Sequence, residues 1–404
     1  MIPEWILHPT VEEVLEKAKS HDLDSRELLH LKSRTFVYPI AHLETLKDPT
    51  EYNKRTIVQT LYNVLRWADE AEDGRLPIPD KIEVLNDQHS VIAEIARRDT
   101  SDSITDLIEG KVNKITNKML EGAVDEETRV FVKHFGKGGK YSPLKEMQTF
   151  DKSIREILRN CTATMTAGMR EALEMRELRT QDDLKKYCDY VAGIVGESLT
   201  DLIMDRKTDN YHEIDRIHAK ILGMTLQLTN ITKNIKEDAD ARSDYPDART
   251  LFLPRDLFPG LTPQELIYGQ EKSAREAREN VFESLYQTAY LNLSSIIDYI
   301  SSIPHELSGY KAFCFSPFIS AVETWKRMRR AGAEAVFEGK KEAVKISPNE
   351  FENIIGFTEA VIKARREEEF LLDYHRNPSR FSFQSGGKQT NYSRWSPKYI
   401  SPKK

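Results

Sequence analysis

The stretch TIVQTLYNVLRWAD, residues 56–69, repeats its apolar side chains at intervals of three and four residues. This period is typical of an α-helix with one buried face. The residues that share the face are Ile57, Leu61, Val64, Leu65 and Ala68. The same period recurs at residues 153–177, 182–204, 213–238, 263–304, 309–331 and 349–375. Because no segment shows a convincing alternation of apolar and polar residues, as a strand does, the sequence predicts an all-α fold.

The composition of the 404 residues favours long helices and excludes several classes of protein. Only 18 glycines and 17 prolines interrupt the chain, and these residues are the usual helix breakers. The 59 basic and 65 acidic residues give a net charge of −6, which excludes a strongly basic nucleic-acid-binding protein. Three cysteines are too few for a disulfide framework and suit a reducing compartment.

No part of the chain predicts a membrane-spanning segment. The first residues lack the basic segment of a signal peptide, and no stretch approaches the roughly 18 apolar residues needed to cross a bilayer. We therefore expect a cytoplasmic protein, and a monomer because nothing in the sequence indicates assembly. The breaks between helical segments are short, which predicts one domain over residues 1–375.

The end of the chain differs from the rest in charge. Residues 376–404 carry seven basic side chains and no acidic one, and they are rich in Ser, Asn, Gly and Pro. This composition is typical of a disordered basic tail. The alternative is a weak peripheral contact with an anionic membrane surface, since clustered basic residues are attracted to such lipids.

An acidic pair ends the helix predicted at residues 56–69. Asp69 and Asp73 are four residues apart, so both carboxylates project from one helical face. Two adjacent carboxylates repel each other unless a cation lies between them, and Mg²⁺ prefers such oxygen ligands. The pair therefore indicates either a magnesium site or a solvated acidic surface.

A polar stripe follows a later helix. Gln227, Asn230, Asn234 and Asp238 are spaced by three, four and four residues, with apolar positions on the neighbouring faces. This pattern indicates either a helix that lines a cavity or one with an exposed polar face.

A third segment, YCDYVAGIVG at residues 187–196, places two glycines inside a helical pattern. Glycine costs about 1 kcal/mol relative to alanine in a helix, so Gly193 and Gly196 indicate close approach of another helix or a ligand. Tyr187 on the same helix is a candidate proton donor or acceptor, or a buried tyrosine with a satisfied hydroxyl.

Taken in order, these segments resemble the squalene/phytoene synthase family, most closely its eukaryotic-type squalene synthases. The first acidic motif reads VLRWADEAED at residues 64–73, and YCDYVAGIVG is intact. Upstream, the SRTF stretch at residues 33–36 is similar to the diphosphate-binding Ser-Arg-Ser-Phe of the family. FCFSP at residues 313–317 and AVKI at residues 343–346 are similar to two later motifs.

The resemblance implies a class I terpene synthase-like helical bundle around an apolar cavity, with residues 1–375 as the catalytic domain. It implies farnesyl diphosphate as substrate and Mg²⁺ as cofactor, with NADPH in those members that reduce their product. The implied metal ligands are Asp69, Asp73, Asn234 and Asp238. The implied diphosphate-binding residues are Ser33, Arg34, Arg66, Gln227, Asn230 and Lys233. Arg66, Asp69 and Asp73 would assist ionisation, Tyr187 would be the base, and Lys345 would be the contact for NADPH.

The chain departs from the family pattern at its second acidic motif and in its later motifs. Asn234 stands where the family has Asp, and Lys233 stands where it has Arg. Phe318 follows Pro317 in place of Gln, and SPN replaces the usual residues after Ile346. Three hypotheses follow. The first is a diverged enzyme that uses farnesyl diphosphate and transfers or rearranges the prenyl cation, with an acceptor or product that need not be squalene. The second is a squalene or dehydrosqualene synthase that couples two farnesyl diphosphates, and the third is a non-catalytic binding homologue.

Overall fold

The computed structural model describes residues 10–32, 34–45, 49–99, 103–136, 142–203, 213–244 and 251–376. These ranges are helical and contain no β-strand, apart from one isolated bridge between Glu177 and Leu251. The predicted all-α fold is confirmed. The predicted basic tail, residues 376–404, lies outside the described residues except for Arg376.

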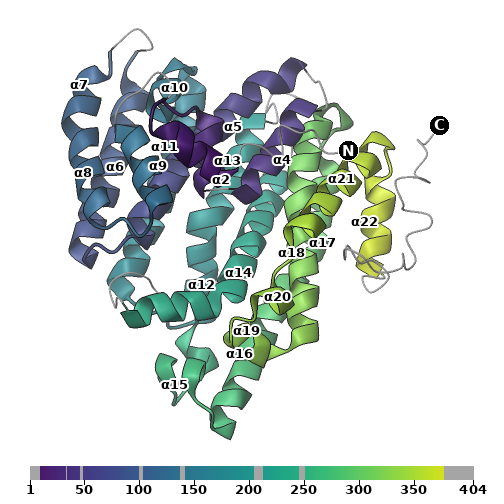
Figure 1. Ribbon diagram of the computed structural model, residues 1–404. Coiled ribbons are helices and arrows are strands. Elements are labelled where there is room, and N and C mark those ends of the chain that lie inside the picture. The colour runs from purple at the N-terminus through teal and green to yellow at the C-terminus, as the bar shows by residue number, and fades with distance from the viewer. Residues whose placement is uncertain are drawn as a thin grey trace.

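The first half of the chain forms helices that pack mainly against one another. Their bounds are α2 (Val11–Ala18), α3 (Ser25–Lys32), α4 (Arg34–Thr45), α5 (Pro49–Asp73), α6 (Ile78–Arg97), α7 (Thr105–Leu107), η1 (Ile108–Val112), α8 (Asn113–Glu121), α9 (Glu126–Gly136), α10 (Pro143–Thr149), α11 (Lys152–Met175), α12 (Gln181–Cys188), η2 (Asp189–Gly193) and α13 (Ile194–Ile203). Helices α6, α8 and α9 lie at one side of the molecule (Figure 1). The helix predicted from residues 56–69 is part of α5, which packs against α3, α4, α6, α10 and α11.

The second half is arranged around the long helix α14. Its elements are α14 (Glu213–Asp244), η3 (Arg255–Leu257), α15 (Pro263–Tyr268), α16 (Lys272–Leu291), α17 (Leu293–Ser302), η4 (His305–Leu307), α18 (Ser308–Ala331), α19 (Ala333–Phe337), α20 (Lys341–Val344), α21 (Pro348–Lys363) and α22 (Glu367–Arg376). Helix α14 packs against η2, α13, α17 and α18. It therefore connects the two halves of the bundle (Figure 1).

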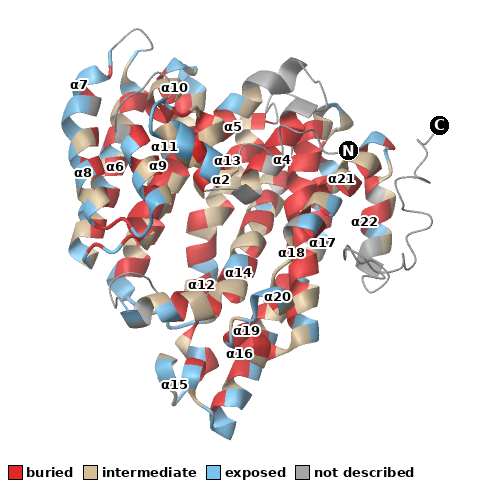
Figure 2. Cartoon of the chain, in the orientation of Figure 1, coloured by how far each residue is buried: buried red, intermediate tan, exposed pale blue. Residues whose placement is uncertain are grey.

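Helix α18 forms the centre of the second half. Every residue from Gly309 to Trp325 is buried, and α18 appears as an almost continuous buried helix in Figure 2. A helix that is covered on all sides needs neighbours on all sides, and α18 contacts α4, α14, α19, α20 and α21.

Two predicted helical segments are interrupted in the structure. Residues 263–304 form three helices. The backbone becomes extended at Gly269, whereas Asn292 keeps right-handed helical angles and separates α16 from α17 by a single turn residue. Residues 349–375 form two helices because Arg365 adopts a left-handed backbone conformation, with φ of 53°. A three-to-four-residue period continues across such breaks, so periodicity did not locate them.

The glycines of the YCDYVAGIVG segment permit close packing against α14. A Cβ atom at Gly196 would lie 2.2 Å from the backbone oxygen of Ala219, and one at Gly223 would lie 2.1 Å from that of Ala192. Backbone atoms cannot move aside as side chains can, so these positions exclude any larger residue. Of the two explanations offered by the sequence, the approach of a helix accounts for Gly196.

None of the described helices combines the length and the apolar character that crossing a membrane requires.

Candidate functional site

The carboxyl end of α5 carries the first acidic motif. Asp69 and Asp73 are one turn apart and half-buried, and Glu72 beside them is buried. Burial raises the pKa of Asp69 to about 7, an effect that Arg66 opposes and Asp73 reinforces. Burial also raises the pKa of Glu72 to about 8, together with the charges of Asp73 and Asp69. Crowded carboxylates with raised pKa values are sites that a bound cation would stabilise.

Tyr187 reaches this acidic group from α12. Its hydroxyl donates to the Glu72 carboxylate, at 3.2 Å from Oε2 and 3.3 Å from Oε1. Its ring stacks on Phe252, with centroids 4.3 Å apart. Burial, followed by the charge of Glu72, raises the pKa of Tyr187 well above its usual value. The hydroxyl therefore keeps its proton and directs it at the acidic group.

Lys81 of α6 contacts the carboxyl end of α5. Its side chain is fully buried, and its ammonium donates to the backbone oxygen of Glu72 at 2.7 Å. A cation at the carboxyl end of a helix is favourable because the unpaired carbonyls there carry partial negative charge. Lys81 also lowers the pKa of Glu72 and so partly offsets the effect of the neighbouring carboxylates.

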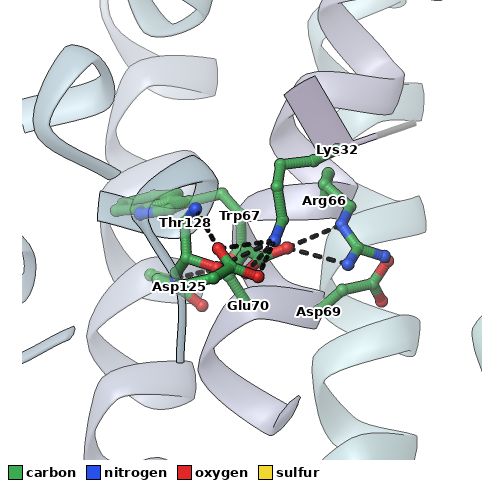
Figure 3. Close-up of polar contacts among 8 residues, drawn as sticks. Lys32, Arg66, Trp67, Asp69, Glu70, Asp125 and Thr128 are labelled. Carbon is green, nitrogen blue, oxygen red and sulfur yellow. Dashed lines mark hydrogen bonds and ion pairs between the residues drawn. The ribbon is translucent and has the colours of Figure 1, made fainter. Parts of the chain in front are cut away.

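Arg66 lies one turn before the motif and makes ion pairs within α5. Its Nη1 atom is 3.2 Å from Oδ2 of Asp69, and its Nε and Nη2 atoms are each 2.8 Å from Oε1 of Glu70. Figure 3 shows these contacts together with Lys32 of α3 and Thr128 of α9, which contact Glu70, and Asp125 just before α9, which contacts Lys32 and Thr128. Burial lowers the pKa of Arg66 but the carboxylates of Glu70 and Asp69 raise it more, so the guanidinium stays charged.

Helix α14 carries the second predicted group. Asn230 is exposed, Gln227 and Asn234 are half-buried, and Asp238 is buried. The Asn234 amide donates to Oδ1 of Asn230 at 3.4 Å. Its own Oδ1 atom is buried without a hydrogen-bond partner among the described residues. A buried oxygen without a donor is a position that a cation would satisfy.

The basic residues near this stripe are oriented by Glu237. Lys345 lies 2.9 Å from Oε2 of Glu237, and Lys341 lies 3.0 Å from Oε1. Burial, and then the charge of Lys345, lowers the pKa of Lys233. The predicted contact of Lys345 with NADPH stays a prediction, and in the structure its ammonium faces Glu237.

The two predicted groups lie on helices that share a neighbour, because α13 packs against both α5 and α14. In the described parts of the chain, no three acidic, histidine or cysteine side chains converge as a complete metal-binding cluster. If Mg²⁺ binds here, amide oxygens, diphosphate or water would have to complete its coordination. The magnesium site stays a prediction, and both the crowded carboxylates and the unpaired oxygen of Asn234 fit it.

An aromatic cluster lies between α4, α5 and α18. The rings of Phe36 and Tyr62 are 4.6 Å apart, and those of Tyr62 and Phe313 are 6.3 Å apart. A separate cavity of about 30 Å³ lies between α12, α14 and α16, a volume that suits water and not a prenyl chain. The predicted apolar cavity for the substrate thus stays a prediction.

Two predicted diphosphate-binding residues cannot be placed. Ser33 lies outside the described residues, and Arg34 is described only as the first residue of α4. No sequence pattern singled out Glu70, Lys32, Thr128 or Lys81 as site residues. Only Glu70 had a local signal, because it stands four residues after Arg66 and therefore on the same helical face.

Residues 51–350 match the family model described as squalene/phytoene synthase. Squalene synthase ERG9 of Saccharomyces cerevisiae is 26% identical over 308 residues, an alignment that covers 74% of this chain and 59% of that protein. Squalene synthase ERG9 of Candida albicans is 27% identical over 328 residues and aligns over 79% of this chain and 63% of its own length. The chain thus spans about 59–63% of the length of these curated relatives.

Two solved structures resemble this chain over most of its length. The complex structure of TcSQS with the ligand E5700 covers 96% of both chains, with a TM-score of 0.63 and 20% identity. The complex of TcSQS with the ligand BPH1237 covers 90% of this chain and 97% of the other, with a TM-score of 0.58 and 18% identity. At this level of identity the likeness shows the fold, and it confirms the predicted class of helical bundle.

Proposed function

Because the chain belongs to the squalene/phytoene synthase family, we propose that it is an Mg²⁺-dependent enzyme that ionises farnesyl diphosphate and transfers or couples the prenyl cation. The observation that carries this proposal is the group formed by Asp69, Glu72 and Asp73 at the end of α5. The raised pKa values of Asp69 and Glu72, and the hydrogen bond from Tyr187 to Glu72, are typical of a functional site.

The residues that would hold Mg²⁺ are Asp69 and Asp73 on α5, with Asn234 and Asp238 on α14. Bound there, Mg²⁺ would neutralise the charge that develops on the departing diphosphate. The cationic side chains proposed for the same oxygens are Arg34, Arg66 and Lys233, with Ser33, Gln227 and Asn230 as polar contacts. Fixed donors aimed at a developing charge lower the barrier to ionisation.

Tyr187 is the proposed proton-transfer residue. Since its hydroxyl donates to Glu72, a proton taken up by the phenol oxygen can be balanced by one passed to the carboxylate. Burial raises the pKa of Glu72, which makes its carboxylate a suitable acceptor for that proton. Tyr187 and Glu72 can thus pass on the transferred proton, so that no isolated charge remains in the protein interior.

We expect this chain to differ from its family in the acceptor of the prenyl group. Asn234 supplies one neutral oxygen where the family has a carboxylate, and Lys233 lacks the planar fork of arginine. A second Mg²⁺–diphosphate would therefore bind α14 more weakly. This favours an acceptor that is a small molecule without the full charge of a second farnesyl diphosphate.

Two alternatives remain to be separated from this proposal. The first is a squalene or dehydrosqualene synthase that couples two farnesyl diphosphates, and it is supported by the intact first motif and the match over residues 51–350. The second is a binding homologue without chemistry. The first requires a product of 30 carbons, and the second requires that no diphosphate be released.

The test is incubation with farnesyl diphosphate and Mg²⁺, with and without NADPH, with diphosphate measured in solution and products identified by mass spectrometry. We expect the protein to release diphosphate. Asp69→Ala should abolish this release, and the surface variant Asp298→Ala should retain it. Release that persists in Asp69→Ala would overturn the site assignment. A 30-carbon product would show that the acceptor is a second farnesyl diphosphate and not the proposed small molecule.

A further inference from the structure

Glu70 is a buried acidic residue at the candidate site. The proposed mechanism assigns it no role. Only 2% of its side chain is exposed, against 25% for Arg66 and 30% for Asp69. It lies on the same face of α5 as Arg66, one helical turn further along. Its burial therefore needs an explanation, because an acidic side chain is rarely buried without cationic partners.

The two carboxylate oxygens of Glu70 have different partners. Oε1 accepts a hydrogen bond of 2.8 Å from Nε of Arg66 and lies 2.8 Å from Nη2 of the same side chain. Oε2 accepts a hydrogen bond of 2.8 Å from the Thr128 hydroxyl and lies 3.3 Å from the Lys32 ammonium (Figure 3). One oxygen thus holds the arginine, and the other fixes the carboxylate to the neighbouring helices.

The outer partners of Glu70 are themselves held in place. Lys32 donates to the Thr128 hydroxyl at 2.8 Å, and it lies 3.4 Å from Asp125. The Thr128 backbone amide donates to Asp125 at 2.6 Å. Lys32 ends α3 and Thr128 lies in the first turn of α9, so the orientation of Glu70 depends on tertiary packing and not on α5 alone.

Different nitrogen atoms of the Arg66 guanidinium consequently face different partners. The Nε and Nη2 edge faces Glu70 inside the protein, whereas Nη1 lies 3.2 Å from Asp69 at the candidate metal site. A free arginine side chain has many rotamers, and fixing them costs up to about 2 kcal/mol. A buried carboxylate that holds one edge removes much of this cost before a ligand arrives.

Helix stability alone is a weak explanation for the pair. Within a helix, an acidic residue that precedes a basic one by four positions is more favourable than the reverse order, and Arg66 precedes Glu70. The contacts of Glu70 with Nε and Nη2 instead suit a residue that orients the Arg66 guanidinium.

We propose that Glu70 is a positioning residue that holds the Nε and Nη2 edge of Arg66, so that its Nη1 edge faces the diphosphate bound beside Asp69. The inference rests on the proposed function, in which Arg66 contacts that diphosphate. Glu70 touches neither diphosphate nor metal, and it acts through Arg66. Lys32 and Thr128 hold Glu70 in turn.

The test measures binding of inorganic diphosphate with Mg²⁺ by calorimetry, for the full chain and four variants. These are Glu70→Gln, Arg66→Met, the double variant and Asp69→Ala. Glu70→Gln keeps the size of the side chain and removes its charge. We expect it to weaken diphosphate binding about tenfold, which corresponds to about 1.4 kcal/mol, and to have no further effect when Arg66 is already methionine.

This design separates positioning from a purely structural role. A structural defect would weaken binding by the same factor in both backgrounds, and that result would overturn the proposal. Unchanged binding in Glu70→Gln would also overturn it. Tighter binding would do so as well, because it would mean that Glu70 competes with diphosphate for Arg66.

A second variant keeps the proposal testable if Glu70→Gln does not fold. Thr128→Val preserves every charge and removes one hydrogen bond to Glu70, so a weakening of about threefold is expected, again only when Arg66 is present. Equal binding by Thr128→Val and the unchanged protein would then overturn the proposal. Failure of the proposed function has a different signature, namely diphosphate binding that Asp69→Ala does not alter.

Discussion

The hydroxyl of Tyr187 lies 3.2 Å from Oε2 of Glu72, although the two residues are on α12 and α5 and 115 positions apart in sequence. The ring of Tyr187 is held against Phe252, and the backbone oxygen of Glu72 is held by Lys81. The contact thus joins two side chains that are each restrained from another direction. It brings a proton donor of high pKa to a carboxylate whose pKa is about 8.

Removal of the Tyr187 hydroxyl should separate ionisation from the later proton transfer. In Tyr187→Phe we expect diphosphate release to change by only a few fold, because the metal-binding carboxylates and Arg66 remain. Formation of the final product should fall by about 10²–10⁴-fold, the usual contribution of a positioned acid or base. Both rates are measured in the same reaction, by phosphate assay after pyrophosphatase and by mass spectrometry.

The matched control for this variant is Tyr268→Phe. Tyr268 is exposed, and its hydroxyl donates to Asp240 at 2.6 Å. The control variant should keep both rates. Equal loss of diphosphate release and product in Tyr187→Phe would contradict the assignment and make Tyr187 part of the ionisation step.

Restoring a carboxylate on α14 should strengthen metal binding there. Asn234→Asp adds one negative charge at a buried oxygen that lacks a hydrogen-bond partner, and hard divalent cations prefer charged oxygen ligands. We expect the Mg²⁺ concentration needed for half-maximal activity to fall about tenfold, which corresponds to about 1.4 kcal/mol. Asn117→Asp, on the exposed face of α8, adds the same charge elsewhere and should leave this concentration unchanged. A higher Mg²⁺ requirement in Asn234→Asp would mean that this side chain does not face the metal.

Ligand binding should stabilise the protein only when both ligands are present. At a diphosphate concentration one hundred times its Kd, with Mg²⁺ in excess, the free energy of unfolding should rise by about 2.7 kcal/mol. Diphosphate alone should have little effect, because the carboxylates of α5 repel it without a cation between them. Thermal unfolding monitored by circular dichroism measures the shift, and EDTA should reverse it. An equal shift for diphosphate without Mg²⁺ would contradict a metal-bridged site.

The close packing of α13 on α14 should not tolerate a methyl group. Gly196→Ala would place a carbon atom 2.2 Å from the Ala219 backbone oxygen, and relief of that overlap requires the helices to separate. We expect the free energy of unfolding to fall by about 3 kcal/mol, at the upper end of the usual cost of overpacking.

Gly356→Ala is the matched control for this substitution. Gly356 lies inside α21, and a Cβ atom there would meet nothing within 4 Å. Because alanine favours the helix more than glycine does, this variant should gain about 0.5–1 kcal/mol. Urea unfolding of both variants measures the difference, and similar values for the two would mean that the close approach of α13 and α14 is not required for stability.

Local patterns in the sequence were sufficient for several of these features. The three-to-four-residue period predicted the helices that became α5, α11, α14 and α18, because burial of one helical face imposes that period wherever the partner lies. The i, i+4 spacing placed Asp69 beside Asp73 and, in principle, Arg66 beside Glu70. The glycine spacing predicted close approach, because few other physical reasons keep a glycine inside a helix.

Contacts between distant segments had no such signal. Nothing local to Glu70 indicates that Lys32 and Thr128 approach it, and nothing local to Glu72 indicates Tyr187. These contacts depend on how α3, α9 and α12 pack around α5, and packing is decided by the fit of whole helical surfaces. The pKa values of Asp69 and Glu72 depend on the same packing, because burial is the largest cause of both shifts.

The sequence by itself thus determined the helical class of this protein, the positions of its acidic and amide side chains along each helix, and its family. Those properties follow from periodicity and from motifs that are contiguous in the chain. Only the tertiary structure decided which side chains meet across helices: Tyr187 with Glu72, and Lys32 and Thr128 with Glu70. The physical reason is that a helix dictates neighbours three and four residues away, whereas the contacts that bury, orient and charge the candidate site come from residues that only folding brings together.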